Sequence, residues 1–76
     1  MKKKTPEKVE QMGRMLLRQI DQHFAGVMWV YTDRPIVNED ALKWLEEQRF
    51  VTTQNTEEHG RARRYYTISD SGRRAI

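Results

Sequence analysis

Three arginines close together in the C-terminal third, Arg61, Arg63 and Arg64, are the residues best suited to chemistry in this chain. A guanidinium group is always charged, pairs with phosphate oxygens through parallel hydrogen bonds, and enters narrow minor grooves of DNA. We therefore interpret these arginines as candidate DNA ligands. The competing interpretation is a solvated turn that is kept polar for solubility.

A second basic cluster, Lys2, Lys3 and Lys4, stands at the N-terminus. Within a flexible segment over residues 1–5, these lysines could follow a phosphate backbone. An ordinary frayed terminus would look the same. Both interpretations stay open.

Other chemistries find no support in the sequence. The chain has no cysteine, and His23 and His59 lack the spacing of a zinc site, so we expect no metal or other cofactor. Ser69, Asp70 and Ser71 lie in no nucleophile motif, and helix capping explains Ser69 better than catalysis does. We expect no enzymatic activity. The lack of cysteine, of a signal peptide and of a long apolar segment favours a cytoplasmic protein without a membrane span.

The charge balance is mildly basic but uneven along the chain. Lys and Arg number 14 against 11 Asp and Glu, which gives a net charge of +3. Four acids gather in mid-chain: Glu39, Asp40, Glu46 and Glu47. The basic surface should therefore be patchy.

A length of 76 residues predicts a single domain, spanning 1–76, around one small core. Apolar spacing predicts a helix from Pro6 to about His23, capped by Thr5 and stopped by Gly26. The run 27–32 is apolar and β-prone, and we interpret it as a strand, with a short buried helix as the alternative.

A second helix should begin at an Asn38 cap, run to Arg49, and turn Leu42 and Leu45 toward the core. Residues 50–54 and 65–68 then predict the strands of a β-hairpin, joined by a turn-forming stretch over 55–60. Ser69 should cap a short terminal helical turn.

Two apolar features could belong either to the core or to an interface. Trp29 and Trp44 could stack on bases, but core packing explains both better. The first predicted helix carries more apolar surface than a small domain easily hides, with Met12, Met15, Leu16 and Ile20. This surplus predicts a homodimer through the first helix, with a simple core wall as the alternative.

The order Leu42-Lys43-Trp44-Leu45-Glu46-Glu47-Gln48-Arg49-Phe50-Val51, followed by Tyr65-Tyr66-Thr67-Ile68-Ser69-Asp70-Ser71-Gly72-Arg73, resembles bacterial winged-helix regulators of the PadR and MarR families. The resemblance implies a small α+β winged helix that binds duplex DNA in transcriptional or mobile-element regulation. Residues 38–49 would form the recognition helix and residues 55–64 the wing.

The proposed recognition helix departs from this pattern in its charge. Its acids outnumber Lys43 and Arg49 and would repel phosphates. Asn38 could still pair with adenine and Lys43 with guanine in the major groove. The alternative function is a protein-interaction module that uses the acidic helix 38–49. The second helix of a helix-turn-helix, expected between Phe24 and Asn38, is shortened or missing.

Overall fold

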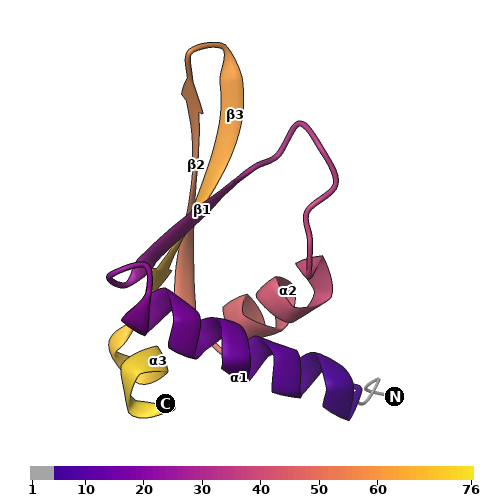
Figure 1. Ribbon diagram of the computed structural model, residues 1–76, viewed down its shortest axis with the longest axis vertical. Coiled ribbons are helices and arrows are strands. Elements are labelled where there is room, and N and C mark those ends of the chain that lie inside the picture. Colours follow the sequence, from indigo (N-terminus) through magenta and orange to yellow (C-terminus); the bar gives the residue numbers. More distant parts are fainter. Residues whose placement is uncertain (1–4) are drawn as a thin grey trace.

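The computed structural model of the protein describes residues 5–76. Within this range the elements are helix α1 (Glu7–Gln22), strand β1 (Val27–Tyr31), helix α2 (Glu39–Glu47), strands β2 (Val51–Glu58) and β3 (Arg61–Ile68), and helix α3 (Asp70–Arg74). The strands form one antiparallel sheet in the order β1-β3-β2. The helices gather at one end, and the β2–β3 hairpin projects away from them (Figure 1). The predicted α+β winged-helix architecture is confirmed.

The core lies where α1 and α2 meet the base of the sheet. Its largest fully buried side chains are Leu17, Ile20, Leu42, Leu45 and Tyr66. Trp44 is only 5% exposed, as predicted for a core residue. The apolar spacing of α2 therefore identified its buried face correctly.

Helix α1 begins one residue later than predicted. Pro6 holds the N-cap position with a ψ of 138°, outside the helical region, and no side chain caps the helix. The predicted cap by Thr5 is wrong, because Pro6 takes the cap position and has no acceptor in its side chain. The predicted stop at Gly26 is confirmed, since Gly26 has a φ of 89° and donates its N–H to the Ile20 carbonyl.

The apolar surplus of α1 is smaller in the structure than in the sequence. Ile20 is fully buried, and Met12 and Leu16 are half-buried. Met15 remains 51% exposed. Pairing of two chains through α1 stays a prediction.

Helix α2 begins where predicted but ends before the predicted Arg49. Asn38 stands at the N-cap position as predicted, although its backbone is left-handed (φ 59°, ψ 34°) and its side chain makes no capping hydrogen bond. At the other end the helix stops at Glu47, because Arg49 turns left-handed (φ 61°) and the Phe50 N–H reaches back to the Leu45 carbonyl. No helix lies between β1 and α2.

The hairpin is longer and its turn tighter than predicted. Its strands run to Glu58 and from Arg61, so the turn consists of His59 and Gly60 alone. Both turn residues have positive φ, as a type I′ hairpin turn requires. The predicted turn over 55–60 is wrong. Residues 55–58 are polar and lie beyond the core, so no burial pattern marks them as a strand, and they are strand residues because they pair with β3.

The C-terminal helix α3 is capped as predicted. The Ser69 hydroxyl accepts a hydrogen bond from the Gly72 N–H (3.1 Å) and donates one to the Arg49 carbonyl (2.7 Å). This second bond connects the start of α3 to Arg49, in the turn that follows α2. Of the helices in residues 5–76, none has the length and apolar character that a membrane crossing requires.

Candidate nucleic-acid interface

Strand register separates the three candidate arginines onto two faces of the sheet. Side chains alternate along a strand, so Arg61 and Arg63 share one face with Trp29 and Tyr31, the residues that β1 places beside them. We call this the outer face. Arg64 points to the opposite, inner face, which also carries buried Tyr66 and lies against the helices.

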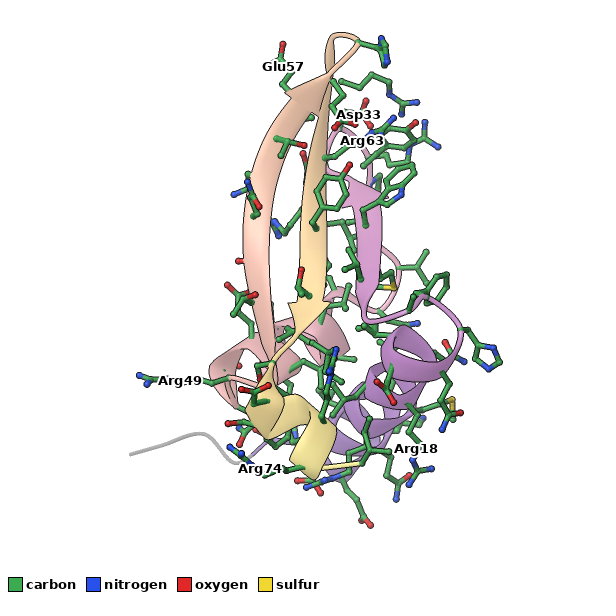
Figure 2. The ribbon with its side chains drawn as sticks, turned by 90° about the vertical axis from the view of Figure 1, so that its left-hand side faces the viewer. Arg18, Asp33, Arg49, Glu57, Arg63 and Arg74 are labelled. Carbon is green, nitrogen blue, oxygen red and sulfur yellow. The ribbon has the colours of Figure 1, made fainter. Side chains whose placement is uncertain are left out.

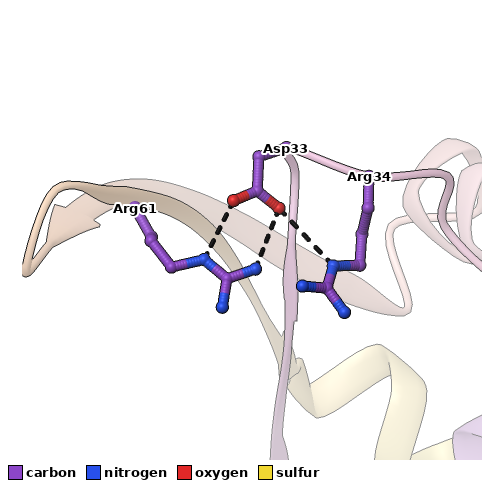
Figure 3. A network of polar contacts seen from close by, with 3 residues as sticks. All are labelled: Asp33, Arg34 and Arg61. Carbon is purple, nitrogen blue, oxygen red and sulfur yellow. Dashed lines mark hydrogen bonds and ion pairs between the residues drawn. The ribbon is translucent and has the colours of Figure 1, made fainter.

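Arg61, near the tip of the hairpin, is held by the start of the β1–α2 connection. Its Nε and Nη2 donate to the two carboxylate oxygens of Asp33 at 2.9 and 3.1 Å, and Arg34 approaches the same carboxylate at 3.6 Å (Figure 3). Hydrogen bonding to Arg61 lowers the pKa of Asp33. The Arg61 guanidinium also lies 3.4 Å from the centre of the Tyr31 ring. A DNA phosphate would have to share or displace the Asp33 contact.

Arg63 is the most enclosed of the three arginines. Its guanidinium lies over the Trp29 ring at 4.3 Å and pairs with Glu58 at 2.5 Å. The Tyr65 hydroxyl and then the Glu58 carboxylate raise the pKa of Arg63. Figure 2 shows Arg63 and Asp33 near the same end of the hairpin, far from Arg18 and Arg74. Arg63 therefore links β1 to the hairpin through Trp29 and Glu58, and its role as a DNA ligand stays a prediction.

Trp29 does not pack in the core, contrary to the prediction. It is 41% exposed on the outer face, where Arg63 and Tyr31 contact its ring. The prediction is wrong because side chains alternate between the two faces of a strand. Of the apolar residues in β1, only the even-numbered Met28 and Val30 pack against the core.

Arg64 lies on the side of the sheet that α2 shares. Its Nε donates to the Asn55 side-chain oxygen at 3.0 Å. Hydrogen bonding with the Tyr66 hydroxyl raises the pKa of Arg64, and the carboxylates of Glu46 and Glu39 add to this effect. Arg64 is therefore the wing arginine that stands closest to the proposed recognition helix.

The exposed side of α2 is acidic. Glu39, Asp40, Glu46 and Glu47 are all exposed, and the one lysine of the helix, Lys43, pairs with Glu39 at 3.8 Å. Asn38 is exposed at the start of the helix, and its side chain is not used for capping. The exposed side of α2 therefore carries more negative than positive charge. Lys2, Lys3 and Lys4 lie outside the described residues.

Asp33, whose carboxylate accepts two hydrogen bonds from Arg61, was not identified from the sequence. No local pattern links the two residues, because they are 28 positions apart. Side chains alternate between the two faces of a sheet along a strand. A predicted strand that began at Arg61 would therefore have placed Arg64 on the face opposite Arg61 and Arg63.

We expect Asp33→Asn to strengthen DNA binding. The substitution removes the carboxylate that engages Arg61, so the guanidinium can meet a phosphate, and the slope of log affinity against log salt should steepen by up to about 0.9. Because the pKa of Asp33 is lowered, this pairing persists at neutral pH and is lost as the pH falls through the carboxyl's folded-state pKa.

Glu10→Gln is the matched control for this experiment. Glu10 forms an exposed ion pair with Arg14 on α1, so the substitution also removes one negative charge and releases one arginine. If both variants strengthen binding equally in a fluorescence titration, net charge and not Arg61 explains the gain.

The fold defines a class of protein, the winged-helix proteins. The model of the PadR-like transcriptional regulator family matches residues 39–76, which is half of the chain. The chain belongs to the PadR-like family. No curated protein and no solved structure matches it significantly.

Proposed function

We propose that this protein regulates transcription by binding duplex DNA, with the β2–β3 hairpin as its main contact. The observation that carries this proposal is the extent of the family match. Residues 39–76 comprise α2 and the β2–β3 hairpin, which a winged helix turns toward DNA, together with α3. The family match therefore covers the elements that would do the binding.

Within the hairpin, Arg64 is our first candidate for a phosphate ligand. Its bond to Asn55 uses Nε alone, and a guanidinium has five N–H donors, so donors remain for a phosphate beside the Tyr66 hydroxyl. It also lies on the α2 side of the sheet, where a duplex in contact with both elements would run. Arg61 is the second candidate, since its bonds to Asp33 use Nε and Nη2 and leave Nη1.

Helix α2 should contribute less to affinity than the hairpin. Its exposed acids repel phosphates, which limits close approach to its N-terminal part. There Asn38 and Lys43 are candidates for contacts with base edges. Lys2, Lys3 and Lys4 are further candidates for phosphates, as a basic arm preceding α1.

We expect Arg64→Ala to weaken binding to duplexes of any sequence. A phosphate contact adds affinity through counterion release, so the salt slope should shrink by about 0.9. Arg61→Ala should shrink it less, because Asp33 already engages this arginine.

Arg74→Ala provides the matched control, since it removes one positive charge from α3, at the end of the molecule opposite the hairpin tip (Figure 2). Equal losses from Arg64→Ala and Arg74→Ala, with both variants folded by circular dichroism, would contradict a wing contact.

The acidic side of α2 supports a second candidate function, a surface for a basic protein partner. The helix has one lysine, Lys43, and its exposed acids are Glu39, Asp40, Glu46 and Glu47. Failure of the intact protein to bind duplex DNA at low salt would favour this second function.

A further inference from the structure

Strand β1 is an edge of the sheet, and its free side presents unused backbone groups. The bonds from Ile68 N–H to Gly26 C=O (2.8 Å) and from Thr32 N–H to Ala62 C=O (3.0 Å) bracket the strand. They show that even-numbered residues of β1 turn their backbone groups toward β3. The backbone groups of Val27, Trp29 and Tyr31 therefore point away from the sheet.

Few of these outward groups have a partner within residues 5–76. The Val27 N–H donates to the Phe24 carbonyl at 3.1 Å. The turn and loop hydrogen bonds of the described residues include none to Trp29 or Tyr31 backbone atoms. A row of backbone donors and acceptors is thus open along the middle of β1.

The strand lacks the charges and prolines by which many proteins protect exposed edges. Natural edges carry lysines, prolines or bulges that discourage pairing with another chain. The sequence of β1 is Val-Met-Trp-Val-Tyr, without a charge or a proline. Val27 and Trp29 are each 41% exposed on the outer face.

The inner side of the same edge opens into an apolar groove of about 460 Å³. The groove lies between β1 and the connection to α2. Its apolar lining includes Leu16, Met28, Val30, Ile36 and Leu42. Apolar side chains on a strand added to this edge would therefore meet the apolar groove on the inner face, and Val27 and Trp29 on the outer face.

We propose that β1 pairs antiparallel with β1 of a second copy of this chain, with Trp29 facing Trp29 across a two-fold axis. In this register Val27 of each copy lies opposite Tyr31 of the other. Odd-numbered residues then form the hydrogen-bonded pairs, in agreement with the direction of the free backbone groups. The Trp29 residues bond reciprocally, and each Tyr31 N–H donates to the Val27 carbonyl of the other copy.

The side chains are self-complementary in the same register. On the outer face the two Trp29 rings meet, and Val27 packs on Tyr31 of the second copy. On the inner face Met28 meets Val30 of the second copy at the mouth of the groove. Arg61 and Arg63 beside the edge are paired with Asp33 and Glu58, which limits repulsion between the copies. A second copy fits this edge because its own β1 is equally uncharged and supplies backbone donors and acceptors to match those of the first copy.

A charge-swap experiment at Trp29 tests the pairing, because only a two-fold contact brings this residue against itself. We expect the intact protein to have twice its 9.1 kDa mass by light scattering at about 100 micromolar, a concentration that reveals weak specific dimers. Trp29→Glu and Trp29→Lys should each be monomeric, and an equimolar mixture should regain the dimer.

Met15→Glu is the matched control, since it places a charge on another half-exposed apolar residue, on α1. It should remain dimeric. A dimer that survives both Trp29 variants, or a mixture of folded monomers that does not pair, would overturn the proposal. A dimer lost only in Met15→Glu would place the contact on α1.

Amide hydrogen exchange of the unaltered protein provides a test that needs no variant. The Trp29 and Tyr31 N–H groups should become protected from exchange as the protein concentration rises through the dimer range. Exchange at these two amides that does not change with concentration, or a monomer at every concentration, would overturn the edge pairing even if the variants failed to fold.

Discussion

Leu45→Ala should cost about 2–5 kcal/mol of folding free energy, the usual range for a leucine truncated in a core. Leu45 is 0% exposed and belongs to the cluster that joins α1, α2 and the sheet. Small domains have a total stability of about 5–15 kcal/mol, so this loss would leave a large unfolded fraction on warming. Urea denaturation followed by circular dichroism measures the change.

Met15→Ala is the control for this truncation. Its side chain is 51% exposed, and we expect its effect to stay within about 1 kcal/mol. If the two variants unfold at the same urea concentration, Leu45 is not the centre of the core and the buried face of α2 has been assigned wrongly.

Gly72→Ala should detach α3 from the body of the domain. A Cβ atom at this position would lie 2.2 Å from the Phe50 carbonyl oxygen and 2.9 Å from Ile68 Cγ1. Backbone cannot yield as a flexible side chain does, so we expect a loss of about 1–3 kcal/mol, as for other overpacked sites. The helix-forming advantage of alanine, about 1 kcal/mol, offsets only part of this.

Ser71→Ala, at the exposed neighbouring position of α3, isolates the steric effect. It should leave the melting temperature nearly unchanged while Gly72→Ala lowers it by several degrees. Equal melting temperatures for the two variants would show that α3 does not rest on the Phe50 backbone.

The sequence predicted the order of the elements because local signals mark most of them. Apolar spacing identified Leu42 and Leu45 as core residues, and Gly26 marked the end of α1. Ser69 was recognisable as a cap from its type and position. These features depend on neighbours within one or two helical turns.

The features that the sequence did not reveal depend on contacts between distant residues. Asn55 to Glu58 look like a turn, but they are strand residues because β3 pairs with each of them. Trp29 looks like a core residue, but its position in β1 turns it to the outer face. The pairing of Asp33 with Arg61 depends on the register between β1 and β3, which no local pattern specifies.

The most direct test of the central claim is a binding titration of the intact protein against mixed-sequence duplex DNA at several salt concentrations. We expect binding at about 50 mM salt that weakens as salt increases, with a slope of about −1 if Arg64 alone contacts a phosphate and nearer −2 if Arg61 also does. Absence of binding at low salt, or an affinity that does not change with salt, would contradict a wing that grips the DNA backbone.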